Sequence, residues 1–511
     1  MLFNSVEFIF LFLPITLFGF FCLARLGQNY ATAWLFAASL SFYSWWDWHY
    51  VGLLLGSIAF HFYIGTWLTK LNQIHKKRLL VGAIGFDLSA LVYFKYADMF
   101  IGTWNLASSH HIALLNVVLP LGISFFTFTQ IAYLIDVYDG KVKEVRALHF
   151  GLFVTYFPHL IAGPVLHHKE MMPQFANPLT YRLRLPLIAL GTSIFVIGLG
   201  KKVLIADNLS SYAGHIFQPQ ADIQFMQAWI GILAYSFQLY FDFSGYSDMA
   251  VGLSILFGIK LPINFYSPYK ARNISEFWRR WHMTLSRFLR DYLYIRMGGN
   301  RLGKTRRYFN LIITMFLGGM WHGAGWNFAV WGLLHGAFLC LHEAWRASFG
   351  RLIPVNKLFQ RLAVVVTFTG VVFAWVPFRA SNLDMTLTIW KSMVGLGGFS
   401  LPEVAFSLFP KVGEFLRGFG VSEAIGGGQK FTFGIFWIFI SAVTAFLAPN
   451  TMQIHRRFKA AIIEPSLLQP QTNKVFITAR FQKTWALCVA LLFALCLLSL
   501  SKPSEFLYFQ F

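Results

Sequence analysis

Repeated apolar runs of near-spanning length constrain this chain more than any other feature. The clear runs are Phe8–Ala24, Ala31–Trp46, Val51–Leu68, Leu79–Phe94, Val117–Ile135, Leu187–Leu199, Ala228–Tyr240, Leu311–Met320, Phe328–Leu341, Leu362–Trp375, Phe431–Leu447 and Trp485–Leu500. Of the whole chain, 57% is hydrophobic and only 12% is charged, whereas a soluble domain carries roughly 25% charged residues. We therefore expect an all-α polytopic membrane protein with about eleven transmembrane helices, since a helix needs about 20 apolar residues to cross a bilayer. The shorter runs then form re-entrant or interfacial helices.

The basic residues predict how the chain is oriented. The formal net charge is +21, and the basic clusters are Lys70–Arg78, Lys141–Arg146, Lys270–Arg307, Arg456–Lys459 and Lys474–Lys483. The positive-inside rule places these clusters in the cytoplasm. The loops Trp45–Tyr50, Lys95–Leu114 and Gly395–Lys430 are then expected outside, as is the N-terminus. Membrane orientation accounts for the charge, so we expect no nucleic-acid partner. The four cysteines lack metal-ligand spacing, and we expect no metal site.

The middle of the chain differs from its flanks. Many polar residues interrupt the apolar runs between Gly151 and Arg307, as do prolines that include Pro158, Pro164, Pro173, Pro186, Pro262 and Pro268. Irregular backbone survives at membrane depth only when it is buried in protein or lines a watery cavity. We therefore interpret residues 1–511 as a single membrane domain, with N-terminal spans over 1–150, a catalytic core over 151–345 and C-terminal spans over 346–511.

The segment Asn273–Tyr294 is predicted to form one amphipathic helix. Asn273 and Glu276 resemble a capping box, and Trp278, His282, Leu285 and Leu289 share one helix face. If the segment has no catalytic or binding role, it is an interfacial helix at the cytoplasmic surface. As a site, it would use Arg279 and Arg280 to attract the phosphates of an anionic donor such as a nucleotide-linked thioester, with His282 pointing inward.

The stretch Gly318–Trp326 places His322 between two tryptophans and four glycines. Glycines allow helices to approach closely or to break, and a neutral imidazole suits a general base. The alternative is a buried histidine that donates to a carbonyl. His335 is the main alternative candidate for the general base, and we expect it in the same helix as His322.

Other polar groups of the core are expected to be mainly structural. Asp242 and Asp248 lie in an apolar run and need partners, which we expect to be arginines of the following helix, unless they line a route for the acceptor. His159, His167 and His168 are interpreted as structural or loop residues.

These motifs resemble those of the membrane-bound O-acyltransferase family, in its bacterial branch that acylates exported polymers. The resemblance is carried by Tyr43–Trp46, Tyr156–Pro164, Gln238–Gly252 and, most sharply, Asn273–His335 with Phe277–His282 and Trp321–Trp326. It implies a ring of helices around a thin centre, with His322 as the catalytic histidine and His282 as the second histidine of this branch.

The resemblance also implies a reaction. The donor is an acyl-CoA on the cytoplasmic side, for which we expect acetyl-CoA, used as a substrate and not bound permanently. The acceptor is an exported exopolysaccharide such as alginate, or a cell-wall glycan, reached through an extracytoplasmic acetyltransferase partner. The expected location is the bacterial inner membrane, among membrane lipids. Alternatives are transfer of D-alanine or another short acyl group, a transporter for an anionic solute, and a scaffold that recruits an exported transferase through Gly395–Lys430.

Overall fold

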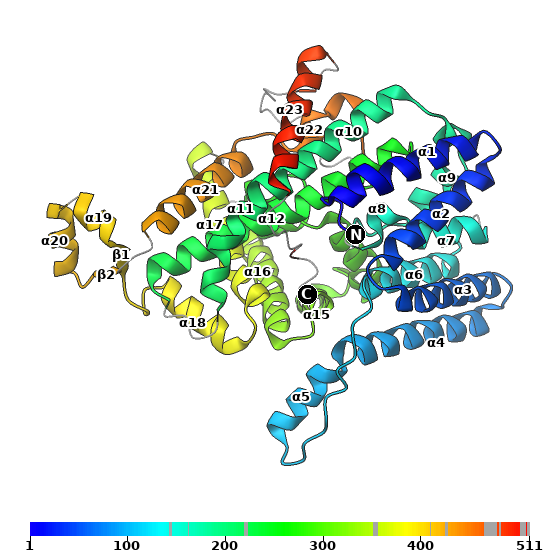
Figure 1. Ribbon diagram of the computed structural model, residues 1–511. Helices are drawn as coiled ribbons and strands as arrows, with labels where there is room; N and C mark the ends of the chain where they lie inside the picture. Colours follow the sequence, from blue (N-terminus) through cyan, green and yellow to red (C-terminus); the bar gives the residue numbers. More distant parts are fainter. Residues whose placement is uncertain are drawn as a thin grey trace.

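The computed structural model is built almost entirely of helices (Figure 1). It describes residues 1–511 except 143–145, 162, 219–222, 351–355, 409, 425–427, 464–477, 480–481, 501–506 and 508–511. Parts of two basic clusters, namely 143–145 and most of 474–483, thus lie outside the described residues. Two three-residue strands, β1 (Ser400–Pro402) and β2 (Ser422–Ala424), pair in parallel. The predicted all-α polytopic fold class is confirmed.

The N-terminal part consists of helices joined mostly by short connections. They are α1 (Leu13–Ala24), preceded by a π-helical turn at Phe8–Phe12, α2 (Gln28–Ser44), α3 (Val51–Leu68), α4 (Gln73–Leu91), α5 (Ala97–Ala107), α6 (Ile123–Tyr138), α7 (Ala147–Thr155), α8 (Phe157–Leu160) and α9 (His168–Phe175). A π-helical turn at Val92–Tyr96 joins α4 to α5, so the two make one helical stretch of 35 residues. The expectation that a loop begins at Lys95 is therefore wrong. Asp98 instead accepts hydrogen bonds from the backbone N–H groups of Leu115 and Asn116, which anchor the loop that follows the helix.

Four helical stretches of the described residues are long and apolar enough to cross a membrane. They are Trp48–Leu68, Gln73–Ala107, Leu185–Phe217 and Lys357–Arg379, and shorter apolar helices cover Phe8–Ala24, Ile123–Tyr138, Phe431–Phe446 and Lys483–Ser499. The chain is thus a multi-pass membrane protein. The count of about eleven spans and the division of the domain at 150 and 345 stay predictions.

The centre of the molecule is the long helix α12 (Phe225–Leu256), which packs along α10 (Leu185–Gly200). Two glycine pairs bring the helices together. A Cβ on Gly245 would lie 2.7 Å from the Gly198 carbonyl oxygen, and one on Gly252 would lie 2.7 Å from the Gly191 carbonyl oxygen. Small residues permit such close backbone approach between membrane helices. The seven-residue spacing of the glycines repeats the contact two turns further along both helices.

Two lysines after α10 neutralise the acids of α12. Lys201 Nζ lies 2.6 Å from Asp248 Oδ2, and Lys202 Nζ lies 2.8 Å from Asp242 Oδ1. Asp207, which begins α11 (Asp207–Ala213), lies 2.7 Å from Lys202. The expectation that arginines of the following helix pair with these acids is therefore wrong. The tight packing of α10 on α12 brings the lysines alongside α12 instead.

The remaining helices build the core and the C-terminal part. They are α13 (Ile274–Trp278), α14 (Met283–Phe288), α15 (Gly303–His322), α16 (Trp326–Phe349), α17 (Lys357–Arg379), α18 (Leu383–Met393), α19 (Glu403–Leu408), α20 (Pro410–Gly418), α21 (Gly428–Phe446), α22 (Thr451–Ile454) and α23 (Lys483–Ser499). The segment Gly395–Lys430, expected as a loop, contains α19, α20 and both strands. These elements stand apart from the main body at the left of Figure 1.

Candidate functional site

His282 lies at a break between two short helices. Helix α13 ends at Trp278, α14 begins at Met283, and His282 has a left-handed backbone with φ of 41°. The prediction of one continuous amphipathic helix over 273–294 is therefore wrong. The predicted cap is only half formed: Asn273 Oδ1 accepts from the Glu276 N–H at 2.8 Å, whereas the Glu276 carboxylate accepts from the Arg272 N–H.

The break is held by an irregular segment around Asn264 and Tyr266. The Met283 N–H donates to the Asn264 carbonyl at 3.0 Å, and the Thr284 hydroxyl donates to Asn264 Oδ1 at 2.6 Å. On the other side of His282, the Tyr266 N–H donates to the Arg280 carbonyl at 3.0 Å. These bonds satisfy backbone groups that a continuous helix would satisfy internally. They fix the direction in which the imidazole projects.

His322 is the last residue of α15, at the turn into α16. The backbone becomes extended at Gly323, and α16 starts three residues later. Gly319 meets the Phe328 carbonyl and the Gly332 backbone so closely that a Cβ would clash. Both predicted roles of the glycines, close approach and a helix break, are therefore confirmed. The expectation that His335 shares the helix of His322 is wrong, because the break places His335 on α16.

Three buried imidazoles form a cluster with aromatic neighbours. The rings of His282 and His322 have centroids 6.2 Å apart, and their exposed fractions are 1% and 7%. Trp331 lies against both His322 and His335, at centroid distances of 5.2 and 4.8 Å. The structure thus brings together the two histidines predicted for the site and places His335, the alternative candidate, against the Trp331 indole.

The ring nitrogens of His282 have no hydrogen-bond partner among the described residues. The same is true of His335. Buried polar atoms are nearly always paired with protein or water, so each exception requires an explanation.

A cavity of about 160 Å³ reaches His322 from one side. Its lining residues are Trp46, Lys95, Leu119, Pro120, Leu121, Gly122, Ile123, Ser124, Phe125, Ile161, Trp321 and His322. Trp46 belongs to the loop that the charge pattern predicts outside the cell. This cavity therefore includes a residue of the side predicted to be extracytoplasmic.

Lys95 lines this cavity but was not predicted from the sequence as a site residue. Its ammonium group donates to the Trp321 carbonyl at 2.5 Å and to the His322 carbonyl at 3.2 Å. The neighbouring Tyr96 hydroxyl donates to the Met320 carbonyl at 2.7 Å. Cations and donors stabilise the carbonyls at the end of a helix. A lysine at the end of an apolar run was a signal for a buried partner, but that partner lies more than 220 positions along the chain.

A second cavity, of about 360 Å³, lies on the basic side of the site. Its apolar lining includes Trp278 and Met283, which flank the break at His282, and its charged residues are Arg279, Arg287, Arg290, Arg307 and Glu343. The arginines belong to the cluster predicted to face the cytoplasm. An anionic ligand with a partly apolar body fits such a lining.

The two arginines predicted to bind a donor have different environments. Arg279 is exposed, lines the cavity and makes no ion pair with a described acid. Arg280 lies 2.6 Å from Glu276 instead and is not among the lining residues. Arg287, another lining residue, is held by a bidentate pair with Glu170 at 2.6 and 2.9 Å. Arg279 is thus the better placed of the two for an incoming phosphate.

The histidines expected to be structural have partners elsewhere. His159 Nε2 lies 2.8 Å from the Phe153 carbonyl, and His167 Nδ1 lies 3.1 Å from the Tyr292 hydroxyl, which donates to Asp136. His168 packs against the Tyr133 ring. None of the three lines the cavities beside His282 and His322.

Fold and site together define a multi-pass membrane protein with a buried histidine pair, a cavity at His322 and a basic cavity at Met283, next to His282. The model of the membrane-bound O-acyltransferase family matches residues 142–390. A peptidoglycan O-acetyltransferase of Helicobacter pylori is 45% identical over 447 residues, covering 82% of this chain and 83% of that protein. A probable alginate O-acetylase of Pseudomonas putida is 43% identical, covering 79% and 82%. A teichoic acid D-alanyltransferase of Streptococcus thermophilus is 31% identical, covering 52% and 70%.

This chain belongs to the membrane-bound O-acyltransferase family. It is therefore an acyltransferase, and the resemblance seen in its motifs is confirmed.

Proposed function

We propose that the protein transfers an acetyl group from cytoplasmic acetyl-CoA toward hydroxyl groups of an exported glycan. The names of its relatives support this, since one acts on peptidoglycan and another is a probable alginate O-acetylase. In our proposal an extracytoplasmic acetyltransferase partner receives the group and completes its delivery. The protein then works in the inner membrane of a bacterium.

One observation carries the proposal: His322 of the buried pair His282–His322 lines one cavity, and Met283, the neighbour of His282, lines a second, basic cavity. The donor enters the basic cavity, where Arg279 pairs with its phosphates. The thioester reaches toward the histidines past Trp278 and Met283. The acceptor hydroxyl enters the other cavity beside His322. This arrangement allows transfer without carrying either whole substrate across the membrane.

The proposed chemistry needs one proton acceptor. The His322 imidazole takes the proton of the acceptor hydroxyl while the hydroxyl oxygen bonds to the thioester carbonyl carbon. The carbon–sulfur bond then breaks, and the thiolate of CoA takes the proton from the imidazolium. His282, whose ring nitrogens are unpaired among the described residues, hydrogen-bonds the reacting groups and positions them. Lys95 holds the end of the helix that carries His322.

The direct test is turnover of labelled acetyl-CoA by the purified protein in lipid nanodiscs. His322→Ala is expected to lower turnover at least a hundredfold, since general-base catalysis contributes about 10²–10⁴-fold. His342→Ala is the matched control, because His342 is a half-buried histidine of α16 outside both cavities. Full activity in His322→Ala, with a monodisperse protein, would contradict the catalytic assignment.

A cellular test addresses the acceptor. Deleting the gene is expected to remove acetyl esters from one exported glycan, as measured by mass spectrometry, and the wild-type gene is expected to restore them. Loss of D-alanyl esters in place of acetyl esters would overturn the choice of acyl group and leave an acyl transfer. An unchanged set of esters on every exported glycan would refute the proposed acceptor class.

A further inference from the structure

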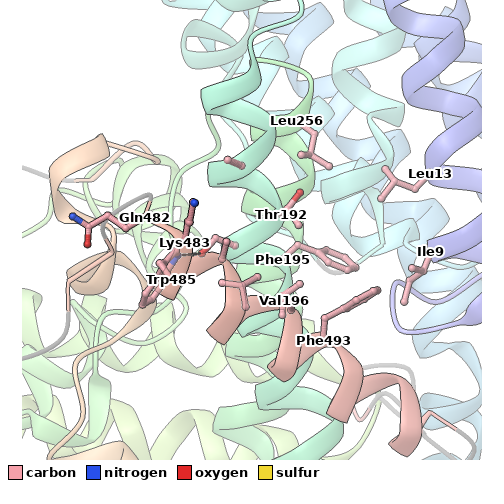
Figure 2. A pocket seen from close by; sticks show the side chains of 15 residues that line it. Ile9, Leu13, Thr192, Phe195, Val196, Leu256, Gln482, Lys483, Trp485 and Phe493 are labelled. Atoms are coloured by element: carbon pink, nitrogen blue, oxygen red, sulfur yellow. Dashed lines mark hydrogen bonds between the residues drawn. The ribbon is translucent and has the colours of Figure 1, made fainter.

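A groove of about 710 Å³ runs along α23, and it is larger than either cavity beside the histidines. Most of its lining comes from Phe8–Ala24, α10 and α23, and Leu256 of α12 also lines it. Figure 2 shows Phe195 and Val196 of α10 facing Phe493 of α23, with Ile9 beyond them. None of the three clustered histidines lines the groove, so it has no part in the site described above.

The lining of the groove is apolar along its length and polar at one end. Its lining residues are Ile9, Leu13, Ala189, Thr192, Ser193, Phe195, Val196, Leu256, Gln482, Lys483, Trp485, Ala486, Val489, Ala490 and Phe493. Gln482 and Lys483 lie at the start of α23, at the opposite end from Ile9 and Phe493 (Figure 2). No lining residue is acidic, so the charge of Lys483 is not compensated within the groove.

Hydrogen bonds fix the polar end of the groove. The Trp485 indole donates to the Ser193 hydroxyl at 3.1 Å, which ties α23 to α10. The same hydroxyl lies 2.9 Å from His455 Nε2, and His455 Nδ1 lies 2.9 Å from the Thr451 carbonyl. With Nδ1 donating to that carbonyl, Nε2 accepts from Ser193. These hydrogen bonds therefore hold α23 against α10 at the polar end of the groove.

The length of the groove matches one leaflet of a bilayer. Trp485 and Phe493 are separated by about 12 Å along the helix axis, at 1.5 Å per residue. Half of the hydrocarbon core of a membrane is about 15 Å thick. Lys483 belongs to the basic cluster predicted to face the cytoplasm. A groove with a cation at that surface and an apolar floor toward the midplane corresponds to the cytoplasmic leaflet.

We propose that this groove binds one anionic glycerophospholipid of the cytoplasmic leaflet. An acyl chain lies between α10 and α23, and the phosphate faces Lys483, Gln482 and the first N–H groups of α23. The groove and the lipid are complementary, because the groove is cationic at the membrane surface and apolar below it, whereas a phospholipid is anionic at its head and apolar in its chains. The site would hold α23 on the remainder of the bundle.

The test uses the full-length protein in nanodiscs that contain equal amounts of phosphatidylglycerol and phosphatidylcholine. Either lipid carries a photoreactive diazirine in its acyl chain, crosslinked peptides are mapped by mass spectrometry, and native mass spectrometry counts the lipids retained in detergent. Ala490→Trp fills the groove from α23. Leu491→Trp is its matched control, since Leu491 is exposed and outside the lining. Lys483→Gln removes the charge, with Lys77→Gln of the exposed start of α4 as its control.

Wild-type protein is expected to crosslink to phosphatidylglycerol at peptides containing Val489 and Phe493 and to retain one such lipid. Ala490→Trp abolishes both signals, whereas Leu491→Trp leaves them unchanged. Lys483→Gln lowers the preference for phosphatidylglycerol about fivefold, the effect of one basic residue near a membrane surface. Crosslinks spread evenly over the surface, or unaffected by Ala490→Trp, would overturn the proposal. So would a lipid-free dimer that Ala490→Trp dissociates, because a second copy of the chain would then occupy the groove.

Discussion

At the scale of single residues, His282 holds a backbone conformation that a histidine rarely adopts. The left-handed region costs an L-residue roughly 1–2 kcal/mol, and such strain persists only where neighbours enforce it. Here the hydrogen bonds of Asn264 and Tyr266 enforce it. The result is an imidazole 6.2 Å from that of His322. We interpret the strain as the means by which a second ring is aimed at the first.

Arg279 and Arg280 are expected to respond differently to neutralisation. Arg279→Gln should raise the KM for acetyl-CoA about tenfold with kcat unchanged, because one charge-assisted hydrogen bond to phosphate contributes roughly 1.5 kcal/mol. Arg280→Gln should leave this KM unchanged and cost up to about 1 kcal/mol of stability through its pair with Glu276. Steady-state kinetics and thermal unfolding measure the two effects. A larger KM effect for Arg280→Gln than for Arg279→Gln would reverse our assignment.

Lys95 is expected to act as a positioning residue. Lys95→Met removes two hydrogen bonds from the end of α15, so His322 is held less firmly, and kcat should fall at least tenfold while the KM for acetyl-CoA stays within about twofold. Lys95→Arg, which keeps a cation and donors, should recover part of kcat. A purely structural role would instead reduce the amount of folded protein and leave the kcat of the folded fraction at the wild-type value.

At the scale of elements, the contact between α10 and α12 depends on glycine. Gly245→Ala would place a methyl group 2.7 Å from the Gly198 carbonyl oxygen and 3.1 Å from the backbone nitrogen of Lys202. Backbone cannot yield easily, so we expect a loss of about 1–3 kcal/mol, seen as a lower midpoint of thermal unfolding in detergent. Gly82→Ala in α4 is the control, since a Cβ there meets nothing within 4 Å, and it should be neutral or stabilising. Equal effects of the two variants would contradict the packing argument.

The sequence predicted helices better than their interruptions. Apolar runs indicated the helices, and the glycines around His322 indicated the turn between α15 and α16, because both signals are local. The break at His282 was missed because the spacing of Trp278, His282, Leu285 and Leu289 also fits an unbroken helix. What breaks it is hydrogen bonding to Asn264, on a segment outside that pattern. The lysine partners of Asp242 and Asp248 were missed for the same reason, because the packing of another helix sets them.

At the scale of the whole molecule, the site combines segments from distant parts of the chain. His322 comes from α15, His282 from the break before α14, and Lys95 from the turn between α4 and α5. Basic residues line one cavity, and Trp46, from a loop predicted outside, lines the other together with His322. His322 lines only the second of these cavities, and His282 lines neither. In our account, this arrangement allows an acyl group to pass while both substrates remain on their own sides.

The most direct test of this account is a sidedness measurement in sealed inside-out membrane vesicles. Labelled acetyl-CoA is supplied to the exposed cytoplasmic face, and acetyl groups are measured on the exported glycan or transferase partner enclosed in the lumen. We predict labelling of the lumenal acceptor by the wild-type protein and by His342→Ala, and none above background by His322→Ala. Equal labelling with His322→Ala, or labelling only when acetyl-CoA is enclosed in the lumen, would contradict the account.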